Sequence, residues 1–187
     1  SVEDWKSNLL KEFPAWLVLP VLGATGGLIS GILISKIAPA AGGSGVTQIM
    51  AYLRHRQVPM GLKVGLVKLV AAIIAIGSGF PLGPEGPSVQ MGGSVAWRMA
   101  KWLNAPIAFR RIIVAAGGGA GIAAVFSAPI GGFIFVIEEL LNSARPLVLL
   151  LVVVTTFWAD TWADVLQGIG LDPTAGGFDK TVGFQLE

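Results

Sequence analysis

The chain has 187 residues, of which 53% are hydrophobic and only 13% are charged. A soluble domain carries about 25% charged residues, so these charges are too few to cover a globule of this size. The mean hydropathy of +0.74 and the 26 glycines are typical of helices that pack closely in lipid. Composition therefore predicts an all-α integral membrane protein and excludes a disordered chain, a disulfide scaffold and an ordinary cytosolic enzyme.

The sequence also excludes several kinds of chemistry and partner. A net charge of +2 is too small, on so apolar a chain, to indicate nucleic-acid binding. The chain has no cysteine and one histidine, His55, so thiolate metal sites and clusters of histidine ligands are excluded. No nucleophile stands with a base in a catalytic pattern. We therefore expect no enzyme activity, no cofactor, no metal and no nucleic-acid partner.

Apolar segments alternate along the chain with stretches rich in glycine and proline. A helix that spans a membrane needs about 20 mostly apolar residues. We expect about seven helices: a short one that begins near Val46, and others at residues 15–41, 61–77, 88–103, 108–126, 129–141 and 146–168. Lys63 and Lys68 are expected to extend from the start of segment 61–77 to the membrane surface. Residues 169–187 are polar and rich in glycine, which predicts an extramembrane connection.

Two stretches, residues 42–45 and 77–87, interrupt the apolar pattern with glycine and proline. Irregular backbone at membrane depth is tolerated only where it is buried in protein or lines a wet cavity. Interrupted apolar segments are typical of a transporter's binding site. The alternative is that both stretches are surface loops between spans.

Each interruption leads directly into a predicted helix. Gly43, Ser44 and Gly45 precede the short helix near Val46, and residues 83–87 precede the next helix but one. A helix N-terminus presents unpaired N–H groups and a partial positive charge. Such dipoles contribute about 0.3–1 kcal/mol each and, without a full positive charge, let a bound anion leave again. The pattern predicts a small anion as substrate, and an ordinary N-cap is the alternative role for Ser44.

Glu85 is the one charged residue between positions 69 and 97. A carboxylate costs about 2.5–3.5 kcal/mol at the membrane centre, so its presence there indicates a function. When ionised beside a helix N-terminus, it competes with an anion for the same donors, and when protonated it releases them. We interpret Glu85 as a gate and proton carrier; the alternative is a solvated loop residue that caps a first helical turn.

Glu138 and Glu139 end an uncharged run that begins at residue 112. Adjacent side chains on a helix point about 100° apart, so at most one of the two readily faces the core. If that residue is Glu139, it is a second proton station. The alternative is that both carboxylates are solvated near the helix end.

Three motifs, in order and at similar spacing, resemble the first half of the CLC family of chloride channels and chloride/proton antiporters. Residues 43–47 (Gly-Ser-Gly-Val-Thr) are similar to the family's Gly-Ser-Gly-Ile-Pro. Residues 83–87 (Gly-Pro-Glu-Gly-Pro) are similar to its Gly-Lys/Arg-Glu-Gly-Pro. Residues 121–139 resemble its apolar stretch that passes through Asn-Ala-Pro and ends in Glu-Glu.

The resemblance implies a fold and an assembly. The fold is the CLC inverted-repeat architecture, with broken and re-entrant helices, and residues 1–187 form a single transmembrane unit that makes up most of the first repeat. The implied partners are chloride, protons, the lipid bilayer, the second half of the same subunit and a second subunit in a homodimer. We expect a multi-pass protein of a prokaryotic plasma (inner) membrane.

The resemblance also implies a function and a site. Ser44, with the helix N-termini at Gly43, Gly45 and Gly86, holds chloride. Glu85 is the gating glutamate and Glu139 the inner proton-transfer residue, which together imply a chloride/proton antiporter. The alternatives are a chloride channel of the same fold, gated by voltage or pH, and a non-transporting structural half.

The chain departs from the family pattern in composition and length. Pro84 replaces a basic residue, which removes a positive charge and an N–H beside Glu85, and Thr47 replaces a proline. The family's second half adds a tyrosine hydroxyl and another helix N-terminus to the anion site, whereas the only tyrosine here, Tyr52, follows the first motif. We therefore expect the 187 residues to be a fragment that does not conduct ions alone. Because lysine and arginine are spread over several connections, the sequence gives no membrane orientation.

Overall fold

The computed structural model describes residues 15–141 and 146–169, and all regular structure within these ranges is helical. The described helices are α2 (Ala15–Ile37), α3 (Val46–Leu53), α4 (Leu62–Gly77), α5 (Glu85–Trp102), α6 (Ile107–Phe126), α7 (Pro129–Phe135) and α8 (Pro146–Gly168), with a 3₁₀ turn η1 (Pro39–Ala41) and a π-helical segment η2 (Val136–Leu141). The prediction of an all-α chain with about seven helices is confirmed. Apart from its first residue, the predicted connection at 169–187 lies outside the described residues.

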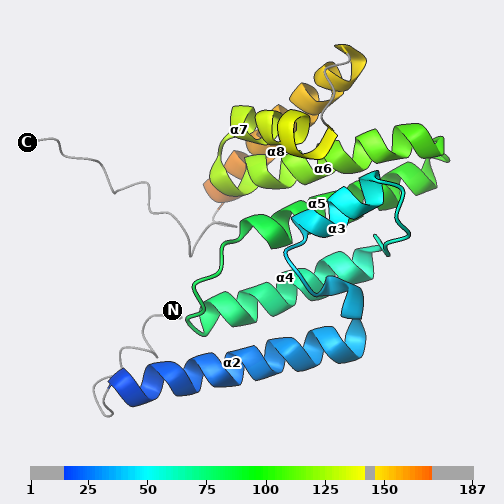
Figure 1. Cartoon of the computed structure of the whole chain (residues 1–187). Helices are drawn as coiled ribbons and strands as arrows, with labels where there is room; N and C mark the ends of the chain where they lie inside the picture. The colour runs from blue at the N-terminus through cyan, green and yellow to red at the C-terminus, as the bar shows by residue number, and fades with distance from the viewer. Residues whose placement is uncertain (1–14, 142–145, 170–187) are drawn as a thin grey trace, which may run out of the picture.

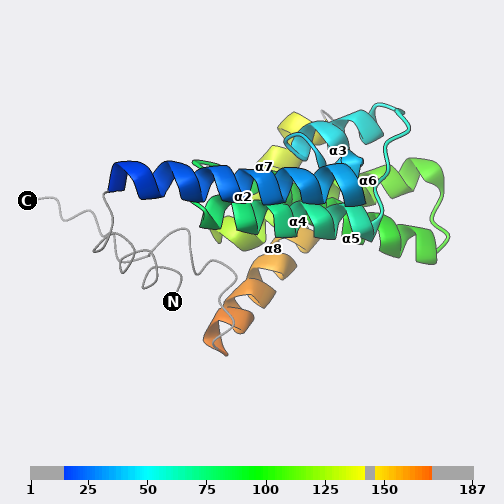
Figure 2. The ribbon, with the colours of Figure 1, turned by 90° about the horizontal axis from the view of Figure 1, so that it is seen from below.

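Four helices form a layer. In Figure 1, α2, α4, α5 and α6 lie side by side in that order, and each contacts the next. Figure 2 shows α3 and α8 on opposite sides of this layer. Helix α3 packs against α5 and α6, whereas α8 packs against α6 and α7. The short helix α3 is therefore held beside the middle of the layer, next to α5.

Proline and glycine set the helix ends. Ala38 precedes Pro39 and is extended (φ −151°, ψ 83°), because a residue before proline is sterically disfavoured in the helical region, so the predicted helix at 15–41 ends at Ile37. Ser127 adopts the left-handed conformation that ends α6, and Pro129 starts α7. Helix α5 begins at Glu85, three residues before the predicted start, so the carboxylate belongs to the first helical turn.

The predicted helix at 129–141 is not a uniform α-helix. It begins as α7 and continues from Val136 as the π-helical segment η2, which contains Glu138 and Glu139. Such π-helical turns are rare and frequently lie at functional sites.

Helices α5 and α6 approach each other backbone to backbone. A Cβ added to Gly92 would overlap the carbonyl oxygen of Gly117, and one added to Gly121 would overlap that of Ser88. The glycine-rich run in α6 is therefore a close-packing surface, as expected for helices in a membrane.

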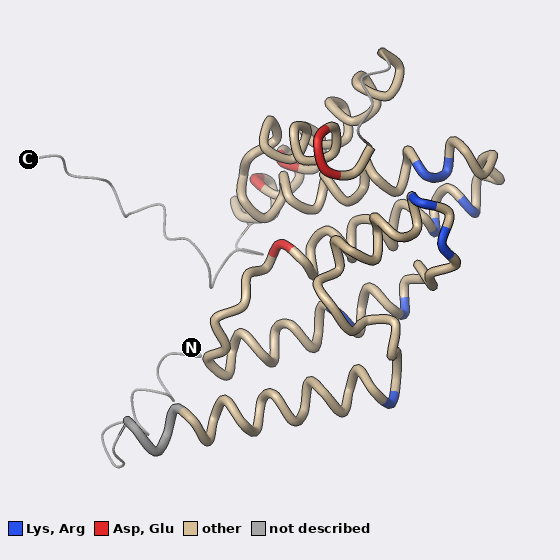
Figure 3. Tube along the Cα trace, viewed as in Figure 1, with Lys and Arg blue, Asp and Glu red and all other residues tan. Residues whose placement is uncertain are grey.

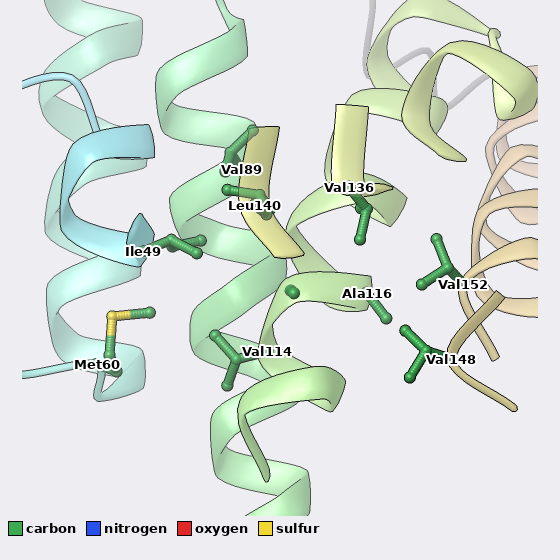
Figure 4. Packing of buried hydrophobic residues seen from close by; sticks show 10 residues of the cluster. Ile49, Met60, Val89, Val114, Ala116, Val136, Leu140, Val148 and Val152 are labelled. Atoms are coloured by element: carbon green, nitrogen blue, oxygen red, sulfur yellow. The ribbon is translucent and has the colours of Figure 1, made fainter. Parts of the chain in front are cut away.

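The main buried cluster joins α3 to α5 and α6. Ile49 of α3 and Val89 of α5 have no exposed surface and pack with Val114 of α6 and Val136 of η2, as Figure 4 shows. Because Ile49 and Val89 lie within the first turns of their helices, the cluster fixes the N-termini of α3 and α5 next to each other.

Within the part of the chain that the structure describes, three segments are long and apolar enough to cross a membrane: Pro20–Ile37, Ile107–Phe126 and Pro146–Gly168. Helix α4 has 16 residues, and at ~1.5 Å per residue it is shorter than the hydrocarbon core. Large apolar side chains on the outer helices are exposed, among them Leu28 and Leu147. The predicted membrane protein with interrupted helices is thus confirmed.

Charges are unevenly distributed along the layer. Figure 3 shows lysine and arginine gathered at one end, where α2 and α5 end and α4 and α6 begin. Within the described residues, the basic side chains of that end are Lys36, Arg54, Arg56, Lys63, Arg98, Lys101, Arg110 and Arg111. Lys68, in the middle of α4, is the exception among the described basic residues. Helix α5 starts at the opposite end, where Glu85 lies.

Candidate functional site

The N-termini of α3 and α5 meet through two glycines. A Cβ on Gly45 would overlap the carbonyl oxygen of Gly86, and a Cβ on Gly86 would overlap that of Ser44. Only glycine permits this approach. The two interruptions that the sequence places far apart are therefore in direct backbone contact.

A cavity of about 640 Å³ opens beside this contact. Its lining includes Gly43, Ser44, Glu85 and Gly86, and Gly45 lies against Gly86 next to it. The other lining residues come from α2, α4, the connection before α5 and the first turns of α3 and α5: Gly27, Ser30, Ile34, Val46, Lys68, Ala71, Ala72, Ala75, Phe80, Leu82, Gly83 and Pro87. The structure thus brings five of the six predicted site residues together; the sixth, Glu139, lies elsewhere.

Ser44 stands between two glycines that take positive φ angles, 86° at Gly43 and 88° at Gly45. Its side chain is exposed, and its Oγ accepts a hydrogen bond from the amide of Thr47 at 3.3 Å and lies 3.2 Å from the Thr47 hydroxyl. The N-cap of α3 is Gly45, so Ser44 is not the ordinary N-cap considered from sequence, although its hydroxyl accepts from an amide of the first helical turn. Because Oγ accepts from that amide, the hydroxyl proton of Ser44 is left to donate to Thr47 or to a ligand.

Glu85 is the first residue of α5, and its side chain is exposed at the cavity. Its carboxylate folds back over Gly83, where any Cβ would overlap it. Among the described residues no group donates a hydrogen bond to this carboxylate. The carboxylate therefore stands beside the N-terminus of α5, at the cavity.

Lys68 is buried beside the cavity, which the sequence did not predict. It was expected at the membrane surface, but its side chain is only 8% exposed and lines the cavity. Its Nζ donates to the carbonyl oxygen of Ala41 at 3.0 Å and to that of Gly43. The expectations of a surface lysine and of a site without a full positive charge are both wrong. One signal was available: Lys68 is four residues after Val64 and three before Ala71, on the buried face of α4.

Glu138 and Glu139 line a second cavity, of about 490 Å³. Arg54 and Arg111 line it as well, and Arg111 Nη1 lies 2.6 Å from the Nε2 atom of His55. Both glutamates are exposed in the described structure, so the burial considered for Glu139 is not seen. The two predicted proton stations, Glu85 and Glu139, thus lie in separate cavities, one at the start of α5 and one beside the basic end of the layer.

Apolar helices interrupted by turns, with two helix N-termini meeting at a cavity, are the architecture of a membrane ion transporter. Residues 26–179 match the family model described as voltage gated chloride channel, and the chain belongs to this family, the CLC family. Membership confirms the family that the three motifs predicted.

Its relatives include exchangers. The chain is 37% identical over 139 residues to the H⁺/Cl⁻ exchange transporter ClcA of Vibrio cholerae. This alignment covers 73% of this chain and 30% of that protein. It is 34% identical over 147 residues to an anion/proton exchange transporter of Saccharomyces cerevisiae. This alignment covers 75% of this chain and 18% of that protein. The chain therefore spans less than a third of the length of these curated relatives.

A solved structure confirms the fold. The crystal structure of a slow cyanobacterial Cl⁻/H⁺ antiporter matches this chain with a TM-score of 0.78 and 31% identity, and the match covers 89% of this chain and 41% of that one. The predicted CLC fold is therefore correct over most of the chain.

Proposed function

We propose that this chain is part of a proton-coupled chloride transporter that moves chloride in one direction and protons in the other. The observation that carries the proposal is the convergence of Gly43, Ser44, Glu85 and Gly86 on one cavity between the N-termini of α3 and α5. Helix N-termini and a hydroxyl suit a small anion. A carboxylate in the same cavity can replace that anion when ionised and release the site when protonated.

The roles of the residues follow from this arrangement. Chloride takes donors from Ser44 and from the backbone at Gly43, Gly45 and Gly86. Glu85 competes with chloride for these donors and carries protons between the site and one side of the membrane. Glu139, in the cavity near the basic end, exchanges protons with the other side. The exchangers among the relatives support transport coupled to protons over a simple channel.

The rest of the protein is also part of the proposal. Ser44 and Glu85 are exposed in the described chain, which fits a site that further helices complete. We expect residues 1–187 to act as one transmembrane unit, most of the first repeat, within a subunit that has a second half. We expect this subunit to form a homodimer in a prokaryotic plasma (inner) membrane and these residues not to conduct ions by themselves.

The test uses the longest native form of the polypeptide in liposomes, with a chloride gradient, no pH gradient, and the voltage clamped by potassium and valinomycin. The chloride gradient is expected to drive protons uphill. Glu139→Ala is expected to lower the proton flux by about tenfold or more while chloride still moves, because a proton-relay group is lost.

Glu138→Ala is the matched control, because it removes the neighbouring carboxylate from the same cavity and should preserve coupling. Chloride flux with a constant internal pH in the wild type would contradict exchange and indicate a channel. Absence of chloride flux and of chloride binding would indicate a structural half.

A further inference from the structure

Four consecutive carbonyl groups lead into the Ser44 turn, and two side chains bind all of them. Lys68 Nζ, from α4, donates to the carbonyl oxygens of Ala41 and Gly43. Gln48 Nε2, from α3, donates to those of Ala40 and Gly42. We call Lys68 and Gln48 the carbonyl clasp. Its two members come from different helices and bind alternate carbonyls of one short segment.

The clasp fixes the direction of the peptide planes before Ser44. A peptide is planar and trans, so its carbonyl and the N–H of the next residue point in opposite directions. Holding the carbonyls of Gly42 and Gly43 therefore aims the amides of Gly43 and Ser44 away from the two donors. Glycine at position 43, with φ of 86°, has little conformational preference of its own to keep this direction.

Burying the ammonium group of Lys68 in the clasp costs free energy, which suggests that the clasp has a function. A buried ammonium group is unfavourable unless it is paired and hydrogen-bonded, and Lys68 is 8% exposed with carbonyl oxygens as its hydrogen-bond partners. These four oxygens carry partial negative charge next to a cavity that we propose binds an anion. Directed at the cavity, they would repel it.

We propose that Lys68 and Gln48 are positioning residues for the anion site: together they turn the carbonyls of residues 40–43 away from the cavity and hold the backbone and hydroxyl donors of Ser44 toward the anion. This inference rests on the proposed function. It assigns Lys68 a role through the loop, in addition to any attraction of its charge across the cavity that it lines.

Gln48 separates these two effects. It is neutral, so Gln48→Met removes two hydrogen bonds from the loop without changing the charge of the site. Lys68→Met removes both its hydrogen bonds and its charge. Lys68→Arg keeps charge and donors, and Lys63→Met removes a lysine from the exposed face of the same helix as a matched control.

The first measurement is chloride and nitrate binding to the longest native form of the protein by calorimetry. Lys68→Met and Gln48→Met are each expected to weaken chloride binding by about tenfold, as expected for the loss of oriented hydrogen-bond donors. Both should also lower the ratio of chloride to nitrate affinity, which a loss of stability alone would leave unchanged. Lys63→Met should bind like the wild type, and Lys68→Arg should bind more tightly than Lys68→Met.

Wild-type affinity and selectivity in Gln48→Met would overturn the proposal, even if Lys68→Met binds weakly, because charge alone would then account for Lys68. The second measurement is amide hydrogen exchange across residues 41–47, which does not require an anion. Faster exchange in both clasp variants than in Lys63→Met supports the clasp, and unchanged exchange overturns it. A wild type that binds no chloride overturns the proposed function instead, and the exchange rates then decide on the clasp by themselves.

Discussion

At the scale of single residues, the role proposed for Glu85 predicts how transport depends on pH. In that role, the ionised carboxylate competes with chloride for the N–H donors at the start of α5, and protonation removes this competition. Chloride flux through the wild type is therefore expected to rise as the pH falls. Glu85→Gln, which is close in shape but does not ionise, should give a chloride flux that varies little with pH and carries no protons. Flux assays in liposomes between acidic and neutral pH measure both effects.

The control for this variant is Asp164→Asn, which removes an exposed carboxylate from α8, far along the chain from the cavity residues. It should keep the pH dependence of the wild type. If Glu85→Gln retains a steep pH dependence, another group gates the anion and the role proposed for Glu85 is wrong.

The residues of the site differ in how well the sequence predicts their roles. Ser44 and Glu85 stand in glycine- and proline-rich interruptions, where the local chemistry of a helix N-terminus is visible without a structure. Lys68 stands in an ordinary apolar helix, and the atoms it binds are 25 and 27 residues away. Gln48 gives no signal at all, because its partners are backbone carbonyls whose direction depends on the fold. Local motifs were therefore predictable, whereas the contacts of the side chains that hold them were not, although the spacing of Lys68 indicates that it lies on the buried face of α4.

At the scale of helices, the contact between α5 and α6 depends on glycine. A Cβ at Gly92 would overlap the Gly117 carbonyl oxygen, so Gly92→Ala forces the two helices apart or strains them, at a cost of about 1–3 kcal/mol. Gly31→Ala in α2 meets nothing within 4 Å and should be neutral or slightly stabilising, because alanine favours a helix. Thermal unfolding in detergent, followed by circular dichroism, should show a lower Tm for Gly92→Ala alone. Equal Tm values would mean that the contact does not limit stability.

The helix boundary at Ser127, just before Pro129, was predicted from the sequence, whereas the first helix ends at Ile37, before Pro39, and not at residue 41 as expected. The π-helical segment η2 was not predicted, since Val136–Leu141 has an ordinary helix-forming composition. This segment packs closely against α6, where a Cβ at Gly119 would overlap the Val136 side chain. A tertiary contact of this kind leaves no local pattern in the sequence.

At the scale of the whole molecule, the fold gathers charges that the sequence leaves scattered. Along the chain, basic residues fall in several connections and give no orientation. In space, helices α2 and α5 end where α4 and α6 begin, so these connections meet at one end of the layer (Figure 3). Basic residues close to membrane-spanning segments favour the cytoplasmic side. The folded chain therefore predicts an orientation, with the cavity of Glu138 and Glu139 toward the cytoplasm and the start of α5 toward the outside.

Cysteine labelling tests this orientation, because residues 1–187 contain no cysteine. Gln57→Cys places a thiol in the exposed connection before α4, at the basic end, and Pro81→Cys places one in the exposed connection before α5. In intact cells, a membrane-impermeant maleimide should label Pro81→Cys and leave Gln57→Cys unlabelled until the membrane is opened. The reverse pattern would place Glu85 on the cytoplasmic side. Because Glu85 and Glu139 lie near opposite ends of the same layer, Glu139 would then exchange protons with the outside and Glu85 with the cytoplasm.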